Sequence, residues 1–271
     1  MKEEYLTKEE CRKVELNILS TIAKICDENN LKYFMCGGTL LGAIRHKGFI
    51  PWDDDIDIML LRNDYEKLVN ILKKQKKYPW LQLLDSTVDG YYYPFAKAID
   101  NTTCAKMEDN VTDHGLWVDI FPYDNYPDDD KIRKRFILKG YFYRSVVMSM
   151  TTDFTASTIK NRKIKKILYL YSKIINKKKF INKYERFCKK YSKNINSKYV
   201  GCLFSPYKLK ECFEREWFNE QKEYTFEKYK FKGPLKYDLF LTKLYGNYME
   251  LPPEEKRRDH KIIAWKKKDS E

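Results

Sequence analysis

Hydrophobic residues in the first third of the chain alternate between helical and extended spacing. A Thr7–Glu10 pair typical of a capping box precedes apolar residues at helical intervals, which predicts a helix over residues 8–28. A short apolar run at 31–36 predicts a buried strand. Two glycines follow this strand, and the pattern after them predicts a short helix over 39–45. The chain therefore begins with a helix, a strand and a second helix in close succession.

The extended pattern then resumes and recurs several times. Residues 55–61 predict a strand, and Asn63-Asp64 predicts the cap of a helix that continues to about Lys74. Strands interspersed with helices in this way predict an α/β, or α+β, fold with a mixed sheet. Further strands are predicted at 81–84, 93–99 and 116–121.

A break rich in proline and aspartate at 126–130 ends this pattern. Beyond the break the apolar spacing is helical to about residue 193, and a mixed tail follows. We therefore predict a catalytic core over residues 1–125 and a mainly helical region over 126–271 that packs on this core.

Composition excludes several classes of protein. The chain has 271 residues, 43% of them hydrophobic and 15% aromatic, which is enough for a buried core and excludes disordered and fibrous proteins. Its longest apolar runs are far shorter than the ~20 residues that span a bilayer, and no apolar leader is visible. The seven cysteines lack C-x-x-C spacing, which fits buried thiols in a reducing compartment. We therefore expect a cytoplasmic protein.

The net charge of +14 (53 basic minus 39 acidic residues) is concentrated in one segment. Residues 160–193 hold 14 Lys and Arg against the single acid Glu185, a net of +13, and their apolar residues recur at helical spacing. Two interpretations are open. The segment is either the solvated face of a packed helix, or an amphipathic surface that contacts anionic lipid at the inner face of the cell membrane, or an anionic polymer. Nucleic acid is not an expected partner, because we find no nucleic-acid-binding motif elsewhere.

The run from Trp52 to Ile58 holds four aspartates. Alternate residues of a strand share a face, so Asp55 and Asp57 are expected to point the same way. Two carboxylates about 4 Å apart repel each other by about 4 kcal/mol at an effective dielectric of about 20. A divalent cation relieves this repulsion, and Mg²⁺ (or Mn²⁺) prefers such oxygen ligands and keeps positions open for phosphate. The alternative is a solvated acidic turn ahead of a strand.

Gly37 and Gly38 lie upstream of these acids, where a predicted strand meets a helix. Backbone N–H groups of the two glycines and of Thr39 can approach a phosphate closely, and the helix N-terminus favours its charge. Arg45 and Lys47 lie between the glycines and the acids. These two side chains either neutralise phosphate charge or pair with neighbouring aspartates.

Two charged residues on later strands extend the pattern. Asp119 supplies a third carboxylate, and two acids on one strand with a third on its neighbour are typical of two-metal phosphoryl transfer. Lys97 is an isolated charge in an apolar strand, so it needs a buried phosphate or carboxylate partner. The nearby aromatic residues 91–93 and Trp117 either belong to the core or form a cage for a quaternary ammonium group.

Three motifs closely resemble the signatures of the LicD family: residues 37–57, 117–122 and 245–253. The matches extend from residue 33 to about 260, so the resemblance covers nearly the whole chain. It implies a nucleotidyltransferase core with the fold of DNA polymerase β, and a distant similarity to fukutin and fukutin-related protein. The basic segment 160–193 carries none of the resemblance.

The resemblance also implies a reaction. Such a phosphotransferase moves a phosphorylated alcohol, most of all phosphocholine, from a CDP-activated donor to a sugar hydroxyl and releases CMP. The acceptors implied are teichoic acid, lipopolysaccharide or capsule, and a lipid-linked acceptor would lie at the membrane. In this mechanism Asp55 and Asp57 hold the metal ion, and Asp119 is a third ligand or the general base.

Two other functions remain open. The same three aspartates serve a nucleotidyltransferase that adds a nucleoside monophosphate to a small acceptor. The chain is alternatively a non-catalytic module that holds polyanions or a membrane through its basic segment. The residues do not distinguish choline from ribitol or glycerol as the transferred alcohol.

Overall fold

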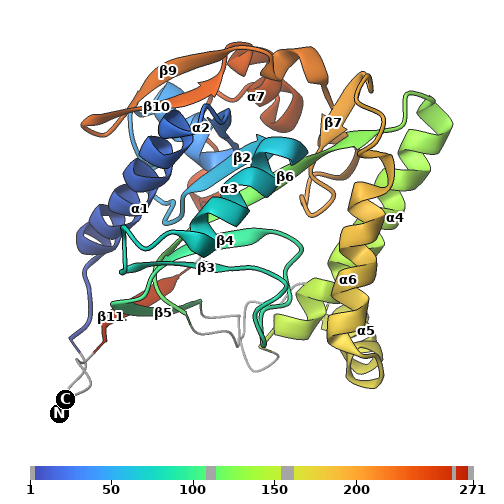
Figure 1. The fold of residues 1–271 in the computed structure, drawn as a ribbon, viewed down its shortest axis with the longest axis horizontal. Helices are drawn as coiled ribbons and strands as arrows, with labels where there is room; N and C mark the ends of the chain where they lie inside the picture. Colours follow the sequence, from blue (N-terminus) through green and yellow to red (C-terminus); the bar gives the residue numbers. More distant parts are fainter. Residues whose placement is uncertain (1–3, 108–113, 154–161, 258–260, 268–271) are drawn as a thin grey trace.

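The structure is a computed structural model that describes residues 4–107, 114–153, 162–257 and 261–267 (Figure 1). It confirms a mixed α/β architecture. The α-helices of the described residues are α1 (Lys8–Glu28), α2 (Gly37–Arg45), α3 (Arg62–Lys74), α4 (Asp130–Thr151), α5 (Arg162–Ile174), α6 (Lys177–Cys188) and α7 (Tyr237–Tyr245). The strands are β1 (Tyr33–Met35), β2 (Asp57–Leu61), β3 (Leu81–Leu84), β4 (Ala96–Asp100), β5 (Thr103–Met107), β6 (Trp117–Tyr126), β7 (Tyr199–Gly201), β8 (Phe213–Glu214), β9 (Gln221–Phe226), β10 (Tyr229–Pro234) and β11 (Ile262–Lys266). Short 3-10 helices are η1 (Lys189–Tyr191), η2 (Lys208–Lys210), η3 (Arg215–Phe218) and η4 (Glu254–Lys256).

The central sheet has the strand order β1-β2-β6-β4-β3. β2 and β6 run parallel, and the other neighbours in this order are antiparallel. β7 pairs with the second half of β6, and β8 pairs with β7. Helices α1 and α3 pack against the sheet, where Val118 and Ile120 of β6 join the core. Successive strand residues point to opposite faces, so Trp117, Asp119 and Phe121 lie on the other face of β6.

Helix α1 begins where the sequence predicted. The Thr7 hydroxyl accepts a hydrogen bond from the backbone N–H of Glu10, and the Glu10 carboxylate accepts one from the N–H of Thr7, which confirms the capping box. Ile18, Leu19 and Ile22 on the helix are fully buried in the core. The apolar positions that predicted this helix therefore form the face that packs on the sheet.

The start of α3 differs from the prediction. Leu61 is the N-cap and makes no side-chain cap, so the predicted cap at Asn63-Asp64 is wrong. Arg62, the first helical residue, instead donates from Nε and Nη2 to the two carboxylate oxygens of Asp124 on β6, each at 2.7 Å. Both side chains are buried, and this bidentate pair ties α3 to the sheet. The start of α3 is therefore held by a residue that lies 62 positions further along the chain.

Several strand bounds also differ from the prediction. β2 begins at Asp57 rather than Asp55, and β4 begins at Ala96 rather than at residue 93. β6 continues to Tyr126, into the predicted break. The hairpin of β9 and β10 and the pairing of β5 with β11 were not predicted, because each is short and mixes polar with apolar residues.

Strands from the second region pair with strands from the first. β7 pairs with β6, and β11 pairs with β5, whereas α4, α5 and α6 gather at one end of the molecule (Figure 1). The division into residues 1–125 and 126–271 stays a prediction. Among the described residues, the helices are all too short or too polar to cross a membrane.

Candidate active site

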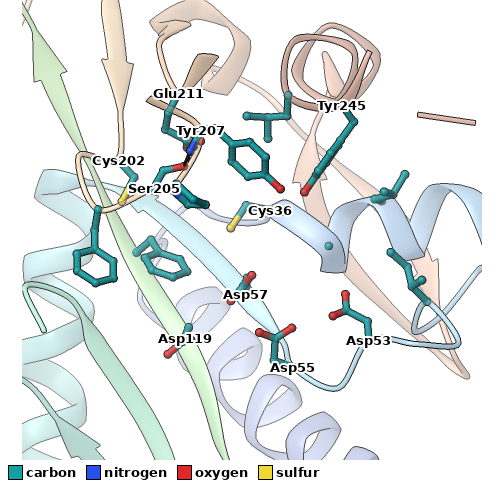
Figure 2. Close-up of a pocket in the computed structure, with 18 of the residues that line it drawn as sticks. Cys36, Asp53, Asp55, Asp57, Asp119, Cys202, Ser205, Tyr207, Glu211 and Tyr245 are labelled. Carbon is teal, nitrogen blue, oxygen red and sulfur yellow. Dashed lines mark hydrogen bonds between the residues drawn. The ribbon is translucent and has the colours of Figure 1, made fainter. Parts of the chain in front are cut away.

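Three aspartates converge at the start of the parallel strand pair β2 and β6. Asp57 is the first residue of β2, and its register partner on β6 is Asp119. Asp55 reaches the same place from the segment that precedes β2. One carboxylate oxygen from each residue lies within 4.8 Å of the other two, and Figure 2 shows the three side chains facing a common space. Tertiary structure thus brings Asp119 to the two acids that the sequence placed together.

Backbone hydrogen bonds fix the segment that carries these acids. The N–H of Asp57 donates to the Thr39 hydroxyl at 2.8 Å, and the N–H of Cys36 donates to the Asp57 carbonyl at 3.2 Å. Arg12 of α1 donates to the carbonyl oxygen of Asp53 at 2.9 Å. The N–H of Asp119 in turn donates to the carbonyl oxygen of Ile56 at 2.9 Å. The acidic segment is therefore held from α1, α2 and β6.

Helix α2 begins at the glycine pair and approaches the acids closely. Gly37 has a φ of +54°, and a Cβ there would lie 3.1 Å from Oδ2 of Asp57. A Cβ on Gly38 would lie 2.3 Å from Oδ2 of Asp53, so a larger residue would displace that carboxylate. The predicted helix thus starts two residues earlier than Thr39. The Thr39 hydroxyl is occupied with Asp57, and the phosphate-binding role of these three residues stays a prediction.

Lys97 on β4 lies beside Asp119, on the side away from Asp57 and β2. Lys97 and Asp119 are register partners on β4 and β6, and Lys97 Nζ lies 2.7 Å from Asp119 Oδ1. Lys97 is 4% exposed, and its ammonium also lies 4.2 Å from the centre of the Trp117 ring. The sequence left open a phosphate or a carboxylate partner, and the structure provides the carboxylate. Contact with a donor phosphate stays a prediction.

The three aspartates, the two glycines and Lys97 line one pocket with a volume of about 930 Å³. Phe121 lies two residues along β6 from Asp119, on the same face of the sheet, and Phe95, just before β4, packs against it with ring centres 4.6 Å apart. Phe204 extends this apolar wall, with its ring 5.1 Å from that of Phe95. The pocket thus has an aromatic wall beside its acidic cluster.

The predicted aromatic cage is only partly at the pocket. Tyr93 and Trp117 are among the pocket-lining residues, whereas Tyr91 is buried in the core and Tyr92 lies under the ammonium group of Lys177. Phe95, Phe121 and Phe204 were not singled out from the sequence. Their strand and loop positions resemble ordinary core positions, and only the fold shows that they line a cavity.

The lining of the pocket also contains a buried carboxyl group, Glu211, that the sequence did not indicate. Glu211 accepts hydrogen bonds from the hydroxyls of Tyr123 and Ser205, and Figure 2 shows it above the acidic cluster. Burial raises the pKa of Glu211 to about 7. Tyr207 and Tyr245 stack edge to face nearby, with ring centres 5.5 Å apart. Tyr245 belongs to a motif noted in the sequence, but Glu211 stands in a segment with no such signal.

Arg45 and Lys47 have different surroundings. Arg45 lines the pocket, and its Nη1 donates to the carbonyl oxygens of Tyr248 and Glu250 at 2.6 and 3.1 Å. Lys47 is exposed, donates to the Ile44 carbonyl, and is not among the described residues that line the pocket. Arg45 therefore joins α2 to the C-terminal motif, and a phosphate contact of either residue stays a prediction.

The donor set of the cluster fits a hard divalent cation. Mg²⁺ binds oxygen ligands at about 2.1 Å, so two ligands of one ion lie about 3–4 Å apart. The oxygens of Asp55, Asp57 and Asp119 lie within 4.8 Å of one another, so small side-chain rotations suffice. Waters and phosphate oxygens would complete the coordination of such an ion.

Comparison with known proteins agrees with this arrangement. The family model described as "LicD/FKTN/FKRP, nucleotidyltransferase domain" matches residues 30–166. Lipopolysaccharide cholinephosphotransferase LicD of Haemophilus influenzae is 31% identical over 276 aligned positions, which cover 95% of this chain and 97% of that protein. Ribitol 5-phosphate transferase FKRP of Homo sapiens is 26% identical over 113 residues, 42% of this chain and 20% of that protein.

Proposed function

The chain belongs to the LicD family and is an enzyme of the transferase class, and from this premise we propose its reaction. It transfers a phospho-alcohol, phosphocholine in the first place, from a CDP-activated donor to a sugar hydroxyl of a cell-envelope glycan, and releases CMP. We further infer that its core has the nucleotidyltransferase fold of DNA polymerase β, which the description of the matching family model supports.

The convergence of three carboxylates on one pocket carries this proposal. Asp55, Asp57 and Asp119 would hold Mg²⁺ (or Mn²⁺), since their oxygens lie within 4.8 Å of one another. When bound, such an ion neutralises the charge of a diphosphate during phosphoryl transfer. A cluster of carboxylates without it would repel an anionic donor.

The remaining polar groups of the pocket orient the reacting atoms. The acceptor hydroxyl oxygen bonds to the distal phosphorus of the donor, and the bond between this phosphorus and the CMP oxygen breaks. Lys97 places a positive charge beside Asp119, and the N-terminus of α2 at Gly37 and Gly38 favours phosphate oxygens. The hydroxyl proton leaves to a general base, and Asp119 is the candidate for that role if it is not a metal ligand.

The aromatic wall supports choline as the transferred alcohol. Phe121 lies two residues, about 6.8 Å, along β6 from Asp119, and the Phe95 ring packs against it. A phosphocholine group whose phosphorus lies at the acidic cluster would reach this wall with its ammonium end. Aromatic rings attract quaternary ammonium groups by about 0.5–2 kcal/mol each. The Lys97 ammonium lies 4.2 Å from the centre of the Trp117 ring and 5.8 Å from that of Phe95, so Phe121 is the candidate contact for the choline ammonium.

The acceptor that we propose is a sugar hydroxyl of a cell-envelope glycan. The relative from Haemophilus influenzae is named for lipopolysaccharide, which supports an envelope glycan as acceptor. Teichoic acid and capsule remain alternatives with the same sugar hydroxyl chemistry. A nucleotide donor is expected in the cytoplasm, so we place the reaction there, with a lipid-linked acceptor at the inner membrane face.

Product analysis tests this proposal. The purified protein is incubated with Mg²⁺ and CDP-choline, CDP-ribitol or CDP-glycerol, with and without glycan acceptors, and CMP release is followed. We expect acceptor-stimulated CMP release, greatest with CDP-choline and absent from Asp57→Asn. Asp130→Asn on α4 is the matched control and should remain active, because the ion pairs of Asp130 among the described residues are with Arg133 and Lys134 of its own helix.

Two outcomes would replace the proposal. Pyrophosphate release from nucleoside triphosphates, without CMP from any CDP donor, would assign a nucleotidyltransferase. A folded protein that binds neither Mn²⁺ nor nucleotides would assign a non-catalytic polyanion-binding module.

A further inference from the structure

Helix α5 (Arg162–Ile174) turns its apolar side to solvent. It packs on α4 through the side that carries Leu168 and the buried Ser172. Residues three, four and seven apart on a helix share a face, so the large apolar residues of α5 form one stripe. The stripe consists of Ile164 (62% exposed), Ile167 (67%), Leu170 (57%), Tyr171 (41%) and Ile174 (83%).

The neighbouring helix shows that exposure of the apolar side is not a general property of the basic segment 160–193. α6 (Lys177–Cys188) is also amphipathic and basic, but Phe180, Ile181 and Tyr184 on its apolar side are buried against α4. Of these two helices, α5 therefore leaves its apolar side uncovered within the described part of the chain. Complete burial of an exposed isoleucine is favourable by about 1.5–3 kcal/mol, and the isoleucines of α5 forgo most of this free energy.

Lysines flank this stripe. Lys163, Lys166 and Lys173 are exposed, and among the described residues no carboxylate forms an ion pair with them. Lys178 of α6, in contrast, pairs with Asp89 at 2.8 Å. The surface of α5 thus combines uncovered apolar area with uncompensated positive charge.

We propose that α5 docks the protein on an anionic lipid bilayer, with its isoleucines at the boundary of the acyl chains and its lysines among the headgroups. An apolar stripe flanked by lysines is the composition of helices that lie in the membrane interface. A soluble polyanion would engage the lysines but leave the isoleucines in water. A second copy of the chain would bring two segments of net charge +13 against each other.

Docking through α5 would also place the pocket at the membrane surface. Lys165 of α5 is one of the residues that line the pocket, so the pocket borders the docked helix. A lipid-linked acceptor could then enter the pocket without leaving the membrane surface. This consequence rests on the proposed function, whereas the docking itself does not.

Vesicle flotation of the full chain tests the proposal without donor or acceptor. We expect binding to vesicles of equimolar phosphatidylcholine and phosphatidylglycerol, and little binding to phosphatidylcholine alone. Replacing Ile167 and Ile174 by Asn should weaken binding about tenfold for each residue. The triple change Lys163→Gln, Lys166→Gln and Lys173→Gln should weaken it about 100-fold.

Leu239→Asn is the matched control, since Leu239 is 46% exposed on α7, far from α5 in the fold (Figure 1). It should bind like the wild-type protein, and circular dichroism should show that all variants are folded. Three results would overturn the proposal: no binding to anionic vesicles, unchanged binding of the isoleucine variant, or a wild-type dimer in sedimentation equilibrium that Ile174→Asn converts to monomer. Vesicle binding does not depend on CMP release, so a protein that releases no CMP would contradict the proposed function but not the docking of α5.

Discussion

Asp119 and Lys97 are register partners on antiparallel strands, and their side chains form a buried ion pair of 2.7 Å. On its other side Asp119 is the register partner of Asp57. One carboxylate therefore belongs both to an ion pair and to the candidate metal cluster. Lys97 offsets part of the repulsion among the acids before any cation binds, and it stands beside the place where a donor phosphate would arrive.

Loss of one acid should weaken metal binding. Asp55→Asn and Asp57→Asn should each lower Mn²⁺ affinity at least about tenfold, because a neutral amide replaces a charged ligand. Electron paramagnetic resonance of free Mn²⁺ measures this affinity. Asp130→Asn, an exposed acid on α4, should leave it unchanged. Equal affinities for the wild-type protein and both cluster variants would remove the metal assignment.

Lys97→Met should make stability depend more strongly on Mg²⁺. Removing one partner of a buried ion pair costs about 3–5 kcal/mol, and here it leaves Asp119 without its cation. Bound Mg²⁺ would supply the missing charge, so Mg²⁺ should stabilise the variant more than the wild-type protein. Urea unfolding in EDTA and in Mg²⁺ measures the difference. Lys73→Met, which breaks a half-exposed pair with Asp85, should show no such coupling, and an equal Mg²⁺ response in all three proteins would contradict the prediction.

Gly37→Ala should affect both stability and the metal cluster. A φ of +54° costs an alanine about 1–2 kcal/mol, and its Cβ would press on Oδ2 of Asp57 at 3.1 Å. Gly90→Ala is the matched control, because Gly90 has a φ of +85° and open space around it. Both variants should lose stability in thermal unfolding, but Gly37→Ala alone should lose Mn²⁺ affinity. Loss in both, or in neither, would show that the glycine does not shape the cluster.

Glu211→Gln should change how stability depends on pH. Burial raises the pKa of Glu211 from 4.5 to about 7, so the native state binds more protons than the unfolded state in this window. Unfolding free energy from this group therefore falls as pH rises from 4.5 to about 7, by about 3 kcal/mol.

The variant should lack this fall, which urea unfolding at about pH 5 and about pH 8 measures. His114, whose pKa burial lowers to about 4, acts in the opposite direction but is common to both proteins. Parallel pH profiles of the two proteins would contradict the prediction.

Phe121→Leu should distinguish recognition of the alcohol from recognition of the phosphate. It removes an aromatic face but keeps the apolar wall, so KM for CDP-choline should rise about tenfold while KM for CDP-glycerol stays constant. Tyr92→Leu, outside the residues that line the pocket, is the control. An equal change for both donors would place the alcohol elsewhere.

The sequence by itself determined the elements whose cause is local. The capping box and periodicity of α1, the glycine pair at the start of α2 and the acids at the start of β2 all lie within short stretches of chain. The long motif over residues 37–57 also indicated the family. Local pattern was sufficient here because caps, turns and side-chain periodicity depend on near neighbours.

Tertiary structure decided everything that depends on distant contacts. It placed Asp119 and Lys97 beside Asp57, buried Glu211 in the pocket wall, and began α3 at the Arg62–Asp124 pair. It also buried the apolar side of α6 while it exposed that of α5, although the two helices have the same pattern. The reason is physical: periodicity shows that a helix has an apolar face, but only packing decides whether protein covers that face.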